Sequence, residues 1–192
     1  LVSCASTCIT YLPGAMPYLR PDLQRVEHWR KRLADLPRPW VALTWAGRPT
    51  HMNDANRSLA LSQLSPLADS GAAFVAIQKG PAEAQAAHPP RGMPLLSLGD
   101  EIRDFEDTAA ILCLADLLVS VDSSPVHLAG ALGRPVWVML PFVPDWRWLL
   151  ERKDSPWYPQ ARLFRQPARG DWSSVIDEIA AELRTLVVST RQ

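Results

Sequence analysis

Short apolar segments that alternate with helical patterns constrain the fold of this chain more than any other feature of its sequence. Such segments, each four to seven residues long and bounded by polar or Pro- and Gly-rich residues, are expected to be buried strands. They are VALTW (41–45), AAFVAIQ (72–78), LLSL (95–98), DLLVSV (116–121), PVWVML (135–140) and RLFRQ (162–166). Strands that alternate with helices form parallel sheets covered on both faces, with right-handed crossovers. The sequence therefore predicts an α/β fold with a Rossmann-like doubly wound parallel sheet.

Helices are expected between these strands and at both ends of the series, at 21–36, about 62–70, 104–115, 124–132 and 171 to about 188. In the first, apolar residues recur at spacings of three and four, which is typical of one buried helix face: Leu23, Val26, Trp29 and Leu33. In the third, the expected apolar face comprises Phe105, Ala109, Leu112 and Cys113. We divide the chain into a linker with its helix (1–38) and one Rossmann-like domain with a C-terminal helix (39–192).

Composition and charge exclude several classes of protein. The 20 Lys and Arg residues balance the 20 Asp and Glu residues, so no basic excess favours a nucleic-acid partner. No apolar run approaches the about 18 residues that a membrane span needs. Cys4, Cys8 and Cys113 are an odd set without C-x-x-C spacing, which argues against a disulfide framework or a zinc site and favours the cytoplasm. The first residues lack the basic leader of a signal peptide, and we expect the chain to be part of a longer protein.

The most informative polar cluster follows the fourth expected strand, in VSVDSSPVHLAG (119–130). Asp122, Ser123 and Ser124 are expected at the carboxyl edge of the sheet, where ligands bind in doubly wound folds. Ser124 suits an N-cap and Pro125 a first helical position, and His127 falls in the first turn. Amides left unpaired there would suit a phosphate, namely those of Val126, His127 and Leu128. The alternative is that the cluster merely caps a helix.

Two further strand ends carry groups compatible with phosphate. The loop after the first strand offers His51, Asp54, Arg57 and Ser58, and Arg57 could hold a phosphate through a forked pair of hydrogen bonds. Lys79 follows the second strand. Each of these cations alone is typical of a solvated surface, but three strand ends with such groups favour an anion site.

Other chemistries of a doubly wound sheet lack their motifs. The first strand is followed by neither G-x-G-x-x-G nor a Walker lysine motif, and G-x-S-x-G is absent. His51, His88 and His127 lie in separate segments without metal-ligand spacing. We therefore expect no metal site and no cofactor.

Five runs together resemble a known family over residues 11 to about 185: WAGRPTHMNDANRS, IQKG, DFEDTAA, VDSSPVHLAGALGRPVWVMLP and DWRWLLERKDSPWYPQARLFRQ. They are similar to the C-terminal half of bacterial tetratricopeptide-linked glycosyltransferases, relatives of the ADP-heptose:lipopolysaccharide heptosyltransferases with the GT-B fold. The segment PGAMPYLRPD resembles the linker that leaves the family's N-terminal half.

The resemblance implies a donor-binding half whose partner, the N-terminal half of the same full-length protein, binds a glycan or protein acceptor. The donor would be a nucleotide-diphosphate sugar, transferred with inversion and without a metal, and the catalytic base would lie in the N-terminal half. The family motif falls on Asp122, Ser123, Ser124 and His127, which would hold the diphosphate and the nearby sugar. Pro125 departs from the family pattern, because it has no N–H.

The resemblance assigns further positions of the donor cleft. Arg57, with Ser58 beside it, matches the cation of the first loop, and Lys79 would approach the nucleoside. Asp107 and Thr108 belong to a further motif of the family. The segment DWRWLLERKDSPWYP (145–159) is either a wall of the cleft or packing, and its lack of a titratable cluster favours packing. The remaining residues of the cleft would be Trp45, Ala46 and Gly47.

Two other functions compete with this interpretation. A non-catalytic nucleotide-binding or scaffold module could keep the same half-fold. A related epimerase would need an additional acidic base in the cleft.

Overall fold

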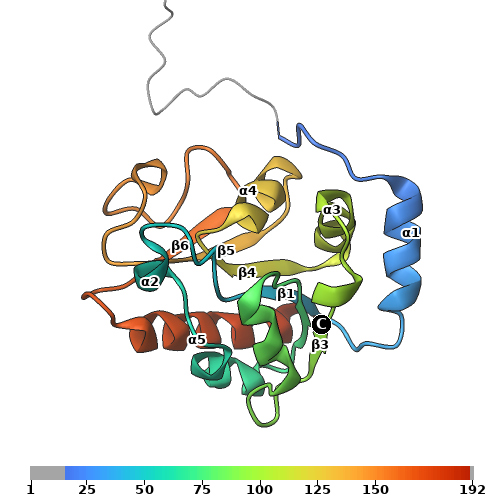
Figure 1. Cartoon of the computed structure of the whole chain (residues 1–192), viewed down its shortest axis with the longest axis horizontal. Coiled ribbons are helices and arrows are strands. Elements are labelled where there is room, and N and C mark those ends of the chain that lie inside the picture. The colour runs from blue at the N-terminus through green and yellow to red at the C-terminus, as the bar shows by residue number, and fades with distance from the viewer. Residues whose placement is uncertain (1–15, 191–192) are drawn as a thin grey trace, which may run out of the picture.

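The computed structural model describes residues 16–190, and its centre is one parallel sheet of six strands in the order β3-β2-β1-β4-β5-β6 (Figure 1). All five strand pairs are parallel. This is the strand order of a doubly wound Rossmann-like fold, so the predicted fold class is confirmed. The strands are β1 (Trp40–Thr44), β2 (Ala73–Ala76), β3 (Leu95–Ser97), β4 (Leu117–Val121), β5 (Val136–Leu140) and β6 (Ala161–Arg165).

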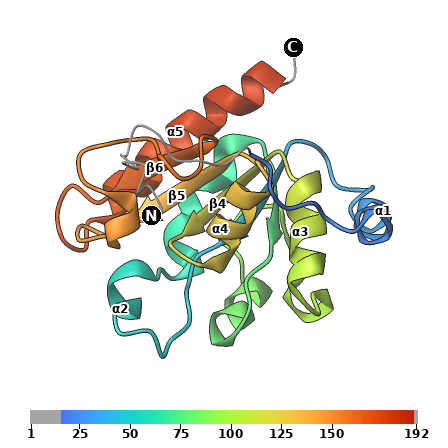
Figure 2. The same ribbon diagram turned by 90° about the horizontal axis from the view of Figure 1, so that it is seen from above.

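Helices cover both faces of the sheet (Figures 1 and 2). Alternate strand residues supply two separate cores, because successive side chains of a strand point to opposite faces. Val41 and Leu43 pack with η1 and α5, whereas Ala42 packs with α1, α3 and α4. The α-helices are α1 (Leu23–Arg32), α2 (Asp54–Arg57), α3 (Phe105–Leu114), α4 (Ser124–Ala131) and α5 (Trp172–Thr190). The 3₁₀ helices are η1 (Leu61–Ser70), η2 (Pro81–Ala87), η3 (Gly99–Glu101) and η4 (Trp146–Trp148).

Helix α1 lies beside α3 and is joined to it by a buried carboxylate. Asp107 accepts hydrogen bonds from Arg25 Nη1 at 2.6 Å and from Trp29 Nε1 at 3.0 Å. Trp29 is buried, as predicted, but the prediction for Leu23 is wrong. Leu23 is the first residue of the helix and is 80% exposed, whereas Val26 and Trp29 supply the buried face of α1.

Several local predictions need correction. Segment 62–70 forms the 3₁₀ helix η1, which contains Pro66, and a second 3₁₀ helix, η2, follows Lys79. The loop after β1 contains the short helix α2. Phe105 is 60% exposed because the first turn of α3 lies at a cleft rather than over the core.

One of the three cysteines lies in the described part of the chain. Cys113 is a partly buried free thiol whose pKa is raised by burial, with Arg134 opposing the shift, whereas Cys4 and Cys8 lie outside the described residues.

Across residues 16–190, the structure holds no helix with both the length and the apolar character that crossing a membrane requires.

Candidate binding cleft

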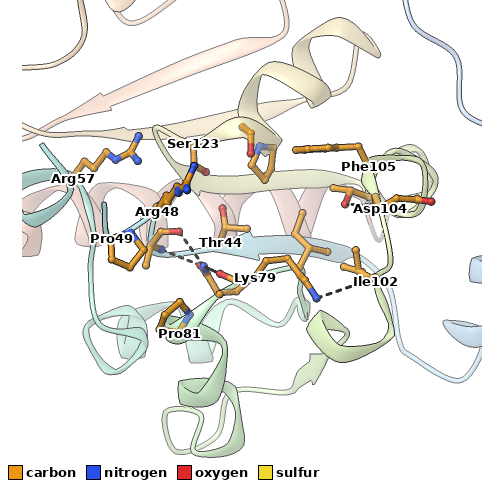
Figure 3. Close-up of a pocket in the computed structure, with 18 of the residues that line it drawn as sticks. Thr44, Arg48, Pro49, Arg57, Lys79, Pro81, Ile102, Asp104, Phe105 and Ser123 are labelled. Atoms are coloured by element: carbon orange, nitrogen blue, oxygen red, sulfur yellow. Dashed lines mark hydrogen bonds between the residues drawn. The ribbon is translucent and has the colours of Figure 1, made fainter. Parts of the chain in front are cut away.

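A cleft of about 660 Å³ opens at the carboxyl ends of β1, β2 and β4 (Figure 3). Strands β1 and β4 are neighbours in the sheet. The chain continues from β1 to β2 and β3 on one side and from β4 to β5 and β6 on the other, so the switch point of the sheet lies between them. Ligands of doubly wound sheets bind at this switch point. Its lining comes from the β1 end, the β2 end, the start of α3 and the start of α4: Thr44, Ala46–Pro49, Arg57, Ile77–Pro81, Ile102–Phe105, Thr108 and Ser123–Pro125.

Cationic side chains dominate the charge of the cleft. Arg48, Arg57, Lys79 and Arg103 line it, against one carboxylate, Asp104. That carboxylate is already bound to Arg25 of α1 by hydrogen bonds of 3.0 and 3.2 Å. The cleft therefore favours an anionic ligand.

Helix α4 starts at the cleft, one residue earlier than predicted. The N-cap is Ser123, not Ser124, and Ser124 is the first helical residue. The Val126 amide is not free, because it donates to the Ser123 carbonyl at 3.0 Å. Pro125 has no N–H, so the amide of Ser124 is the one best placed for an anion. Both serines line the cleft.

Arg57 reaches the cleft from α2 and is held at two points. Its Nε lies 3.2 Å from Asp54 Oδ1, and its Nη1 donates to the Asp122 carbonyl at 2.7 Å. Ser58 does not line this cleft; its hydroxyl accepts from the Gly47 amide at 2.9 Å and donates to Asp54 at 3.0 Å. A Cβ on Gly47 would overlap the guanidinium, so Gly47 is required for the position of Arg57.

Lys79 lines the cleft but is tethered by main-chain oxygens. Its Nζ donates to the Gly99 carbonyl at 2.6 Å and to the Ile102 carbonyl at 3.2 Å (Figure 3). Carbonyl partners neutralise no charge, so the ammonium remains a cation at the cleft wall.

The predicted role of Trp45 in lining the cleft is wrong for its side chain. Trp45 is fully buried and packs in the core on the α5 side of the sheet. Its backbone N–H instead meets Gln78, which the sequence did not single out. Gln78 Oε1 accepts from the amides of Trp45 and Ala46, each at 3.0 Å, and its Nε2 donates to the carbonyls of Ala46 and Lys79. One buried carboxamide thereby joins the ends of β1 and β2.

His127 and Asp122 lie beside the cleft, next to Ser123, rather than among its lining residues. His127 Nδ1 is 3.1 Å from the Tyr158 hydroxyl, and its Nε2 is 3.9 Å from Asp122 Oδ1. Its ring stacks on Trp148 with centroids 5.6 Å apart. Burial lowers the pKa of His127 below its usual value, although Asp122 opposes this shift, so the imidazole is neutral at neutral pH.

Four other residues were singled out from the sequence, and one of them, Thr108, lines the cleft. Asp54 holds Arg57, and Asp107 joins α1 to α3. His51 does not line the cleft, and its Nδ1 accepts from the Asn53 amide.

Sequence reasoning did not assign several lining side chains to the cleft, among them Arg48, Arg103 and Phe105. Arg48 follows β1 by four residues, and its place near a strand end was the available signal. Arg103 precedes α3, and Phe105 is its first residue. The start of this helix reaches the cleft because β1 pairs with both β2 and β4, a long-range arrangement that local sequence does not reveal.

Within residues 16–190, no group of three or more His, Cys, Asp or Glu side chains is arranged to hold a metal ion.

A family model and one curated relative match this chain. The model of glycosyltransferase family 9 (heptosyltransferase) matches residues 102–139, which contain α3, β4, α4 and most of β5. Protein FlbA from Caulobacter vibrioides (strain ATCC 19089 / CIP 103742 / CB 15) is 29% identical over 189 residues, covering 92% of this chain and 30% of that protein.

Two solved structures share the fold. ADP-heptose lps heptosyltransferase II from E. coli aligns with a TM-score of 0.63 and 18% identity, over 94% of this chain and 57% of that one. A family 9 glycosyl transferase from Veillonella parvula DSM 2008 aligns with a TM-score of 0.56 and 11% identity, over 90% and 52%. The chain thus spans about half the length of these enzymes and about a third of FlbA. The resemblance to the heptosyltransferases is confirmed: the chain has their Rossmann-like fold and carries a segment that matches glycosyltransferase family 9.

Proposed function

We propose that this chain is the donor-binding half of an inverting, metal-independent glycosyltransferase that uses a nucleotide-diphosphate sugar. The observation that carries the proposal is the cationic cleft at the switch point of the sheet, where Arg57 and the start of α4 converge. Helix amides and fixed cations stabilise a diphosphate leaving group without a metal. The family 9 match spans the α4 side of this cleft.

The facing half of the enzyme would come from the same full-length protein. It would supply the glycan or protein acceptor site and the catalytic base, in the cytoplasm and beside tetratricopeptide repeats. Within the cleft described here, the one lining carboxylate, Asp104, is paired with Arg25. That pairing disfavours an epimerase, which would need a free acidic base.

A non-catalytic binding or scaffold module remains the second candidate. The tethering of Lys79 by carbonyls favours it, because this cation already has partners in the absence of a ligand.

Calorimetric titration with ADP, UDP and GDP, with and without a chelator, tests the proposal. We expect at least one nucleotide to bind, with equal affinity in both conditions. Loss of binding with chelator would contradict metal independence, and no binding by any nucleotide would favour the scaffold.

A further inference from the structure

The surroundings of His127 are more constrained than a helix-capping role requires. Tyr158, from the segment between η4 and β6, places its hydroxyl 3.1 Å from Nδ1. Trp148, fully buried, stacks on the imidazole with an interplanar angle of 18°. One nitrogen and one face of the ring are therefore held, and Nε2 is the nitrogen left toward Asp122, at 3.9 Å.

Gly130 makes the approach of Tyr158 possible. It lies three residues after His127 on α4, so the two positions share one face of the helix. A Cβ built on Gly130 would overlap the ring of Tyr158. A residue without a side chain is thus needed for the phenol to reach the imidazole.

Electrostatics determine where the proton of the neutral imidazole lies. A lone pair on Nε2 would face the Asp122 carboxylate, whereas an Nε2–H would be attracted to it. Burial raises the pKa of Tyr158 to about 12, together with an electrostatic interaction and a hydrogen bond with Tyr18, so the phenol keeps its proton. Tyr18 and Nδ1 are its two possible acceptors, and a proton on Nε2 leaves Nδ1 free to accept it. The other charged groups near His127, Arg147 and Asp145, have opposite signs and oppose each other.

We infer that Tyr158 is a positioning residue that holds neutral His127 as the Nε2–H tautomer, with that N–H directed toward Asp122 and the diphosphate end of the cleft. The use of this N–H by a ligand rests on the proposed function; the tautomer itself does not. A phenol oxygen can also accept a hydrogen bond. A second proton can therefore enter at Nδ1, donated to the Tyr158 oxygen, while Nε2–H keeps its direction.

The test is the ¹⁵N spectrum of the imidazole nitrogens in histidine-labelled protein at mildly alkaline pH, with His127 assigned by the signal lost in His127→Gln. In the wild type we expect Nε2 to show the shift of a protonated nitrogen and Nδ1 that of an unprotonated one. Tyr158→Phe should move the two shifts toward each other, because both tautomers become populated. Tyr18→Phe removes the other hydrogen-bond partner of the Tyr158 hydroxyl. It should leave both shifts unchanged if the Tyr158 proton is donated to Nδ1, whereas a change would show that the proton is donated to Tyr18.

Gly130→Ala gives a second variant that keeps the hydroxyl but displaces the ring, and it should change the shifts in the same direction. Wild-type shifts in Tyr158→Phe, or a proton on Nδ1 in the wild type, would overturn the inference. In a parallel ADP titration, Tyr158→Phe should bind roughly three- to tenfold more weakly, the effect of losing one hydrogen bond. If the wild type binds no nucleotide, the proposed function fails while the tautomer result still stands.

Discussion

Arg57 donates from Nη1 to the backbone carbonyl of Asp122 at 2.7 Å, which joins the loop after β1 to the turn that begins α4. With the Asp54 contact at 3.2 Å, this bond positions a guanidinium beside the helix start that is expected to bind phosphate. Protein groups thus join the two elements of the candidate site, and this arrangement leads to specific expectations for binding.

Replacing Arg57 with alanine should weaken nucleoside diphosphate binding roughly ten- to hundredfold, because a hydrogen bond to a charged group contributes about 1.5–3 kcal/mol. Binding of the corresponding nucleoside should barely change. Calorimetry on the two ligands measures both effects. Equal losses for nucleoside and diphosphate would show that the variant damages the cleft as a whole.

Gly47→Ala should have nearly the same effect as Arg57→Ala. The added Cβ would lie 2.6 Å from Asp54 Oδ1 and would overlap the guanidinium, so Arg57 must leave its position. In the Arg57→Ala background the guanidinium is gone and only the close contact with Asp54 Oδ1 remains, so the glycine substitution should then cost less further affinity. A double-mutant cycle on diphosphate binding measures this coupling, and additive losses would contradict it.

Diphosphate affinity should depend on pH through His127. Burial lowers its pKa in the free protein, so the ring is neutral near neutral pH, while a bound phosphate favours the cation. Binding then takes up protons, and affinity should fall as pH rises through the pKa of His127 in the complex. Titrations across this range should give a flat profile for His127→Ala. A wild-type profile that is equally flat would remove His127 from the site.

Asp107→Ala should lower the free energy of unfolding by about 1–3 kcal/mol, because it leaves the buried indole N–H of Trp29 without its acceptor. Burial raises the pKa of Asp107, but bonds from Arg25, the Arg103 amide and Trp29 outweigh burial and lower it overall. This stabilisation is therefore present above the pKa of an unfolded aspartate and is lost as pH falls through the native pKa. Urea denaturation at several pH values measures this loss of stability. Glu27→Gln is the control, because Glu27 forms an exposed ion pair with Arg30.

The chain on its own should bind a donor nucleotide but not transfer its sugar, because the proposed acceptor site and base lie in the facing half. Incubation with a nucleotide sugar and a candidate acceptor, followed by mass spectrometry of the acceptor, is the measurement. Robust turnover by this chain would contradict the proposed division of roles.

The strands and their faces were predictable because buried strands are continuous apolar runs, and all six predicted runs contain the observed strands or overlap them. The sequence also held a signal against a cleft role for Trp45. Val41, Leu43 and Trp45 occupy alternate positions, so Trp45 continues the face that packs against α5.

Other features depend on contacts that local sequence does not encode. Ser123 and Ser124 are both good N-caps, and Ser123 takes the position in the folded chain, where its hydroxyl lies 3.2 Å from that of Ser120. The partner of His127 lies 31 residues further along the chain, at Tyr158. The division at residue 38 stays a prediction, and residues 1–15 of that segment lie outside the described part of the chain.

The carbonyl tethers of Lys79 bear on how fast a ligand arrives. Although Glu83 lies close enough for an electrostatic interaction, the Lys79 ammonium donates its hydrogen bonds to uncharged groups, the Gly99 and Ile102 carbonyls, which fix its direction. Together with Arg48, Arg57 and Arg103, it gives a near-neutral chain a local positive potential at one opening. Encounter with a polyanion should then be electrostatically steered, and its association rate constant should fall as ionic strength rises while that of an uncharged nucleoside does not.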